Sequence, residues 1–410
     1  MKQGLSMTTR HQIAKGFALE YAKATKREKG ILLDNLCAAT GWSRANARRR
    51  VTTEISKITG KKPVALPKRR PRTYQPATIT LLTRIWTLAA EPCGKYLAAI
   101  IADELERLER FGELKTHADL LTDEVRHQLL NMSAATMDRY LKPVRDARYP
   151  ADSLSSTKPG AMLRSEIPIR WSGTPMEQAP GFFEVDTVAH CGHSLKGEFL
   201  YSITLTDVFT GWTANCAVRN RAHRNVVAGI EALVQSLPYP MTGLDFDNGG
   251  EFINVQLIEW AEQQHVDLTR ARAYQHNDNA HVEQRNRDWV RRHAFRYRYE
   301  GPEELAILNE LWELVGWRKN HLLPMVKANG YGTARSGRSK RTYDAPRTAY
   351  QRLLDLGAMD EDHARALAGV HQELNPAQIT RRINQLQGQL ITRAKLRARA
   401  GGVDFGEHFR

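Results

Sequence analysis

Apolar residues recur at helical spacing over residues 8–56 and again over residues 78–148. A spacing of three to four residues predicts amphipathic helices. In the first region one stripe runs through Ile31, Leu32, Leu36 and Cys37. Between residues 181 and 270 the pattern changes to short apolar runs with near-alternating polarity, which predict strands. Helical spacing returns after Glu300, so the chain is expected to be helical, then α/β, then mainly helical.

The α/β region predicts an ordered set of elements. Its first three strands are close together in the chain, and a meander is the simplest arrangement for them. The last predicted helix begins near Asn279, where the Asn side chain can cap it, and runs through Trp289 towards Tyr297. The expected strands are 182–188, 199–207, 213–218, 244–246 and 266–269, and the expected helices before the last one are 225–237 and 255–263.

The length of 410 residues favours several domains. Proline and glycine clusters mark the connectors between them. We expect a helix-turn-helix module over 1–60, a basic Pro-rich linker over 61–77, a second helical DNA-binding module over 78–148, a connector over 149–180, a catalytic core over 181–300 and a basic, largely helical C-terminal region over 301–410.

A turn followed by a basic helix lies in the first module. Gly41 suits a tight turn and Ser43 can cap the next helix. This pattern is typical of a helix-turn-helix whose second helix enters the DNA major groove, although a solvated basic helix in a small bundle would look the same. The basic residues are Arg44, Arg48, Arg49 and Arg50. Residues 133–142 have the small residues and basic end of a second recognition helix.

Charge strengthens the case for a nucleic-acid partner. The chain has a formal net charge of +15 and a pI near 9.7, the balance expected of a protein that binds a polyanion. The linker cations can contact phosphates without reading bases, or can belong to a solvated spacer. They are Lys61, Lys62, Lys68, Arg69, Arg70 and Arg72. We expect double-stranded DNA as the partner.

The four cysteines are scattered without a CxxC pair, so we expect neither a disulfide framework nor a Cys-rich zinc site. His190, Cys191 and His193 are near one another, but a structural zinc site needs four ligands, and we do not expect zinc there. No apolar signal core or long apolar run occurs, so membrane spanning is not expected. A cytoplasmic, nucleoid-associated protein fits these features.

Three acidic residues occupy three distinct local patterns. Asp186 lies in the first predicted strand, where Glu184 shares its face and is the rival candidate. Asp247 follows a short strand and precedes Asn-Gly-Gly, a usual place for site residues. Glu283 lies on the last predicted helix, and 35 residues separate it from Asp247. Taken singly, each acid could be an ordinary strand-end, turn or surface residue. Hard cations such as Mg²⁺ prefer such carboxylate oxygens.

The motifs Phe183-Glu184-Val185-Asp186-Thr187, Asp245-Phe246-Asp247-Asn248-Gly249 and Asn279-Ala280-His281-Val282-Glu283, in this order, resemble those of the DDE transposases of the retroviral-integrase superfamily. The resemblance implies a ribonuclease-H-like core with a mixed sheet. It also implies Asp186, Asp247 and Glu283 as catalytic and metal-binding residues, with two Mg²⁺ ions or with Mn²⁺ instead. No His-His-Cys-Cys zinc domain is present in the sequence, so an insertion-sequence transposase fits better than a retroviral enzyme.

The implied activity is cleavage at transposon ends followed by transfer of the 3′-hydroxyl into target DNA, by a homo-oligomer on DNA. Arg287 and Arg291, which follow Glu283 closely, are expected to bind DNA. Two alternatives remain open: a non-catalytic DNA-binding regulator derived from a transposase, and a metal-dependent nuclease that cuts without joining. Asp207, at the end of the second strand, is expected to support the structure. The stretch with Arg335, Arg338, Lys340 and Arg341 is expected to contact DNA flexibly.

Overall fold

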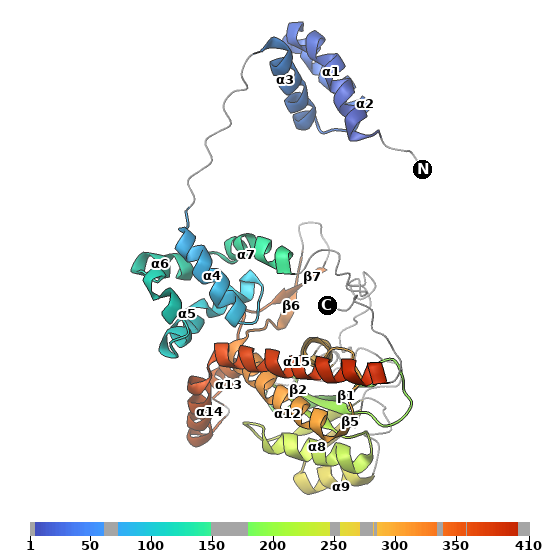
Figure 1. Ribbon diagram of the computed structural model, residues 1–410, viewed down its shortest axis with the longest axis vertical. Helices are drawn as coiled ribbons and strands as arrows, with labels where there is room; N and C mark the ends of the chain where they lie inside the picture. The colour runs from blue at the N-terminus through green and yellow to red at the C-terminus, as the bar shows by residue number, and fades with distance from the viewer. Residues whose placement is uncertain are drawn as a thin grey trace. The chain divides into compact units, whose positions relative to one another are not determined.

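The computed structural model describes residues 5–60, 73–148, 179–246, 255–270, 282, 285–333, 339–357 and 359–400. These residues fall into two compact units that divide between Thr73 and Tyr74 (Figure 1). The segment 74–148 belongs to the same unit as the sheet. A helical N-terminal region, a central mixed sheet and a mostly helical C-terminal region agree with the predicted fold class.

The first unit is a bundle of three helices with well-defined ends. Thr25 and Glu28 form a reciprocal capping box at the start of the second helix. Gly41 ends that helix with φ of 70°, and the Ser43 hydroxyl accepts the Asn46 N–H at the start of the third, as the sequence predicts. The predicted apolar stripe is wrong at one position, because the Ile31 side chain is 55% exposed. The helices are α1 Met7–Lys23, α2 Lys26–Thr40 and α3 Arg44–Thr59.

The second unit begins with a helical segment that has its own apolar core. Leu82, Ile85, Trp86 and Leu97 are buried there. Trp86 donates its indole N–H to the carbonyl of Pro92, which satisfies the one polar atom of this side chain. The elements are α4 Pro76–Leu88, α5 Gly94–Arg110, η1 Lys115–Leu120, α6 Asp123–Leu130 and α7 Ala134–Arg148.

A five-stranded mixed sheet lies at the centre of this unit. Its order is β3-β2-β1-β4-β5, with β1–β2 and β2–β3 antiparallel and β1–β4 and β4–β5 parallel. The predicted meander and the order of the strands are therefore confirmed, with strand bounds shifted by at most two residues. The strands are β1 Phe182–Ala189, β2 Tyr201–Asp207, β3 Thr213–Val218, β4 Gly243–Phe246 and β5 Asp267–Arg270.

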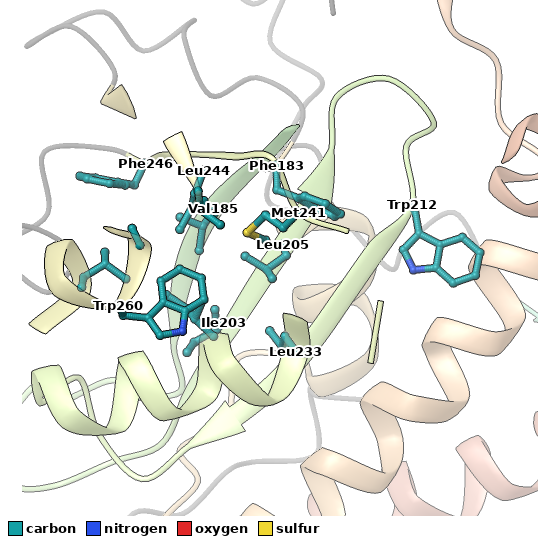
Figure 2. Close-up of a cluster of buried hydrophobic side chains, with 14 of the residues drawn as sticks. Phe183, Val185, Ile203, Leu205, Trp212, Leu233, Met241, Leu244, Phe246 and Trp260 are labelled. Carbon is teal, nitrogen blue, oxygen red and sulfur yellow. The ribbon is translucent and has the colours of Figure 1, made fainter. Parts of the chain in front are cut away.

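The two faces of the sheet pack against different sets of helices. Phe183, Val185 and Leu205 belong to a core that also contains Leu233 of α8 His223–Gln235 and Trp260 of α9 Val255–Gln264 (Figure 2). On the opposite face, Val188 packs in a second core with residues of α12 Gly301–Trp317 and α15 Pro376–Ala400. Strand alternation thus assigns odd and even positions of β1 to different cores.

The helix predicted to run regularly to Tyr297 is different in the structure. Residues Asn286–Arg291 form a π-helix, η3, followed by a short α11 at Arg292–Ala294. Phe295 then has φ of 60°, which ends the helix. A π-helical turn is uncommon and is frequently found at functional sites.

The C-terminal helix α15 contacts both the helical segment and the sheet domain. Arg381 forms a two-pronged pair with Glu113, with N–O distances of 2.8 Å, and Thr380 donates its hydroxyl to the Leu88 carbonyl at 2.7 Å. Near its other end, Arg397 binds Glu304 of α12 at 2.5 Å. The remaining elements before it are η4 Arg318–Leu322, α13 Ala349–Asp355 and α14 Glu361–Glu373.

The expected flexible stretch before α13 contains a β-hairpin that the sequence analysis missed. Strands β6 Ala328–Thr333 and β7 Ser339–Tyr343 pair as a separate two-stranded antiparallel sheet. Arg335 and Arg338 lie outside the described residues. In the ranges that the structure describes, no helix has both the length and the apolar character needed to cross a bilayer.

Candidate active site

Strand β1 presents two carboxylates on one face. Phe183 and Val185 point into the core beneath α8 and α9, and Glu184 and Asp186 occupy the alternate positions. Glu184 is 2% exposed, whereas Asp186 is half-buried. The two rival acids therefore differ in their access to solvent.

Glu184 holds the backbone of another element. Its Oε2 accepts the Val282 N–H at 2.9 Å, a long-range contact between β1 and the residue before Glu283. A buried carboxylate is costly unless donors satisfy it, and a backbone N–H is such a donor. Glu184 thus has a clear structural role in fixing where the chain enters this helical segment.

Asp186 receives two described donors. Its Oδ1 accepts the Thr187 N–H at 2.7 Å, and its Oδ2 accepts the Asn286 side-chain amide at 2.6 Å. The contact with Asn286 joins β1 to η3, the element that follows Glu283 in the chain.

Strand β4 brings a further acid to the edge of the site. Asp245 is 2% exposed and accepts the Thr269 hydroxyl of β5 at 2.5 Å. Asp245 pairs with Glu184 in the parallel register, and Phe246 pairs with Val185. Asp245 therefore connects β4 to β5. Phe246, the last described residue of β4, lies beside Val185, which precedes Asp186.

Asp247 and Glu283 lie outside the described residues, but the residues before them are described. Phe246 precedes Asp247 and is paired with Val185, which precedes Asp186. Val282 precedes Glu283 and donates to Glu184 on the same strand. Three chain segments that are distant in sequence thus meet at the middle of β1.

Asn286 is a site residue that the sequence analysis missed. It is 5% exposed, and its Oδ1 is a buried acceptor without a donor among the described residues. The signal available in the sequence was its position three residues after Glu283, on the same side of a helix. An unsatisfied amide oxygen beside a carboxylate gives a set of hard oxygen donors, which fits Mg²⁺ or a water molecule bound to it.

Element η3 carries both an ion-paired acid and exposed basic residues. Asp288 binds Lys319 of η4 at 2.5 Å, which attaches η3 to the rest of the unit. Burial raises the pKa of the Asp288 carboxyl, but the charge of Lys319 and its hydrogen bond outweigh burial and lower that pKa overall. Arg287 and Arg291, two residues predicted to bind DNA, are exposed on this same element.

The DNA-binding residues predicted in the first unit have different environments. Arg48 and Arg49 are exposed on α3, and Arg49 also donates to Asn46 at 2.9 Å. Arg44 forms an ion pair with Asp34, and the Arg50 guanidinium lies over the Trp42 ring at 5.9 Å. The predicted linker cations Lys61, Lys62, Lys68, Arg69, Arg70 and Arg72 lie outside the described residues.

His190 and Asp207, two further residues considered in the sequence, are buried and hydrogen-bonded within the fold. His190 is 2% exposed, bonds Ser202 Oγ at 2.8 Å, and has its pKa lowered to about 3, chiefly by burial. Asp207 is fully buried and accepts the Gly181 N–H at 2.8 Å and the Thr210 hydroxyl at 2.7 Å. These donors make Asp207 a structural residue of the β2–β3 turn, in keeping with its expected supporting role.

Comparison with known proteins adds to this geometry. Residues 177–276 match the family model described as the integrase core domain. The uncharacterized protein y4rM of Sinorhizobium fredii (strain NBRC 101917 / NGR234) is 34% identical over 327 residues, which cover 80% of this chain and 90% of that protein.

Among solved structures, the HTLV-2 integrase catalytic core domain in complex with magnesium (dimeric form) is 15% identical, with a TM-score of 0.28, and the alignment covers 36% of this chain and 92% of that one. The catalytic core domain of BIV integrase is 14% identical, with a TM-score of 0.29 and coverage of 44% and 97%. Membership of a family is shown by the match to y4rM.

Proposed function

This chain belongs to the family of y4rM, within the integrase/transposase superfamily, and from that membership we propose that it is a DNA transposase. It would cleave DNA at transposon ends and transfer the 3′-hydroxyl into target DNA. The observation that carries the proposal is the meeting of three segments at β1, where Phe246 and Val282 lie beside Val185 and Glu184. Each acid of the triad follows one of these segments directly or lies within it.

In this proposal Asp186, Asp247 and Glu283 would hold two Mg²⁺ ions. Such ions would supply activation of the attacking oxygen and stabilisation of the leaving oxygen in an in-line displacement at phosphorus. Asn286 orients the Asp186 carboxylate through its amide, at 2.6 Å. Glu184 and Asp245 hold the backbone and the neighbouring strand, so they support the site without taking part in the reaction.

DNA binding is proposed for exposed cations of both units. Arg287 and Arg291 are exposed on η3, the element that carries Asn286, and they can neutralise phosphates close to the reacting strand. In the first unit the exposed pair Arg48 and Arg49 on α3 is suited to a DNA groove. Lys and Arg of the linker would add contacts to phosphates that do not depend on sequence.

Joining of labelled element-end DNA into a plasmid, with Mg²⁺ or Mn²⁺, tests the proposal. Asp186→Asn, Asp247→Asn and Glu283→Gln should each abolish joining and leave end binding intact. Asp267→Asn and Glu262→Gln are matched controls, because both residues are exposed in the same domain and Asp267 pairs with Gly243 at the start of β4. They should retain joining.

The wild-type result also separates the alternatives. Cutting without any joined product would identify a nuclease. Binding of the ends with neither cutting nor joining would identify a non-catalytic regulator. A triad variant that still joins strands would remove that residue from the site.

A further inference from the structure

The hairpin formed by β6 and β7, here called the ribbon, has little of the described part of the chain packed against it. Tyr331 and Tyr343 are 54% and 50% exposed, and every other described side chain of the two strands is exposed except the half-buried Gly332. An isolated two-stranded sheet is marginally stable in water and needs further packing. The ribbon therefore presents a surface suited to a partner.

The base of the ribbon is firmly held. The Lys327 N–H donates to Asp344 Oδ1 at 2.7 Å, and the Asp344 N–H donates to the Lys327 carbonyl at 3.0 Å. Arg352 of α13 binds the other oxygen of Asp344 at 2.5 Å. The Lys327 ammonium reaches the Val208 carbonyl in the β2–β3 turn at 2.8 Å. The ribbon thus extends from a fixed point on the catalytic core.

The two faces of the ribbon differ in chemistry. The register pairs Tyr331 with Arg341 on one face, and Tyr343 follows Arg341 at the alternate position of β7. Gly330 and Gly332 occupy the other face, where they pair with Thr342 and Lys340 of β7. Glycine within a strand weakens it and often marks a place where a ligand approaches the backbone closely.

All charged residues between Glu313 and Asp344 are basic, since no Asp or Glu occurs between them. The carboxylate of Asp344 is already bound by Lys327 and Arg352. Lys340 and Arg341 lie on β7 without an acidic residue in either strand to balance them. A strand from a second copy of this chain would bring like charges together, whereas a polyanion would neutralise them.

We propose that the ribbon binds duplex DNA. The major groove admits a two-stranded β-ribbon, and side chains such as Arg and Tyr commonly bond phosphate oxygens. The face with the two glycines also carries Lys340, a further cation for phosphate, and the fixed base sets the position of the DNA relative to the core. This inference rests on the proposed function in one respect, namely that duplex DNA is the substrate.

The salt dependence of binding to a short mixed-sequence duplex tests the charge contribution in the full-length protein. Arg341→Ala should reduce the slope of log K against log salt by about 0.9, between about 0.05 and 0.2 M salt. This change of slope corresponds to roughly eightfold weaker DNA binding by Arg341→Ala than by the wild type at about 0.1 M salt. Arg365→Ala on exposed α14 is the matched control and should change neither value. An Arg341→Ala slope equal to that of the wild type would overturn the inference.

A photo-crosslinking residue at position 331 gives an independent readout with the ribbon intact. We expect crosslinks to DNA from position 331 and none from Val370, which is 44% exposed on α14. Crosslinks to a second protein copy, or none at all, would contradict DNA binding by the ribbon. A protein that joins strands without a crosslink at position 331 would refute this inference alone, whereas a crosslinked protein that never joins would refute the proposed function alone.

Discussion

The amide of Asn286 donates to Asp186 Oδ2 at 2.6 Å, joining the first strand of the sheet to the π-helix that follows Glu283. This contact spans 100 residues of sequence. It fixes one oxygen of the carboxylate and therefore limits the directions from which a cation or a substrate phosphate can approach. In the proposed reaction Asn286 would act through Asp186, as a positioning residue.

Asn286→Ala should lower strand joining by about 10–100-fold, the usual effect of losing a partner that orients a metal ligand. The Mg²⁺ concentration required for half-maximal joining should rise as well, which a purely structural defect would not cause. Joining rates measured across a Mg²⁺ titration check this. Asn225→Ala, which removes a side-chain amide bonded to Asn220 at the start of α8, is the control. An unchanged Mg²⁺ requirement would exclude the positioning role.

Glu184 and Asp186 should separate into a structural and a catalytic acid. Glu184→Gln keeps an acceptor for the Val282 N–H, so we expect joining to persist. Glu184→Ala leaves that N–H without a partner and should cost roughly 1–3 kcal/mol of unfolding free energy. Asp186→Asn should abolish joining with little loss of stability. Urea unfolding and the joining assay, applied to all three variants, measure both effects. Loss of joining in a stable Glu184→Gln protein would reverse the assignment.

Acid should destabilise the second unit through its buried histidines. Burial is the main cause that lowers the pKa of His190 and His293 to about 3 and that of His321 to about 4. Between these values and the ordinary 6.5, the unfolded chain binds protons that the folded chain does not, so stability falls as pH falls below 6.5. Each histidine contributes up to about 1.4 kcal/mol per pH unit.

Melting temperatures measured from pH 7 to pH 5 check this expectation, and they should fall. In His190→Gln the fall should be smaller, because one of the three buried imidazoles is gone. Replacement of the exposed His223 by Gln should leave the profile as in the wild type. A flat profile in the wild type would show that the buried imidazoles are protonated in the folded protein.

Glu104 should change the stability of the folded chain with pH in the opposite direction to the histidines. It is 2% exposed, and burial raises its pKa to about 7, against the opposing influence of Arg107. Between the ordinary 4.5 and about 7, the folded chain keeps a proton that the unfolded chain loses, so this group lowers stability as pH rises. Glu104→Gln should therefore gain roughly 2 kcal/mol at pH 8 and much less at pH 4.5.

Chemical unfolding at the two pH values measures this gain. Glu106→Gln on the exposed side of α5 is the matched control, for which we expect no pH-dependent difference. An equal gain for Glu104→Gln at both pH values would contradict the raised pKa and would indicate a packing effect instead.

The strands and most helices of the core could be predicted because their patterns are local. The third strand was predicted at its observed bounds, 213–218, and the caps at Gly41 and Ser43 were predicted correctly. Alternation along β1 also placed Glu184 and Asp186 on one face. The alternation could not distinguish the two acids, because only Glu184 accepts the N–H of Val282, which lies about 100 residues away in the sequence.

Other features depended on contacts that no local pattern reveals. The π-helix η3 carries Asn286, which contacts Asp186 of β1, and Trp289, which packs in the second core, whereas the local pattern predicted a regular helix. The ribbon was missed because glycine and basic residues weaken the strand signal. Near the C-terminus, Arg393 and Arg397 bind Glu303 and Glu304 of α12, pairs that join distant parts of the chain.

The position of α15 in the chain has a consequence for biosynthesis. This helix joins Glu113 of the helical segment to Glu304 of the sheet domain, and it follows both in sequence. During translation it leaves the ribosome after its two partners, so each must first collapse with an apolar surface still uncovered. The arrangement of the second unit is therefore completed last, by α15 together with the end of α14, whose His371 carbonyl accepts from Arg107 of the helical segment.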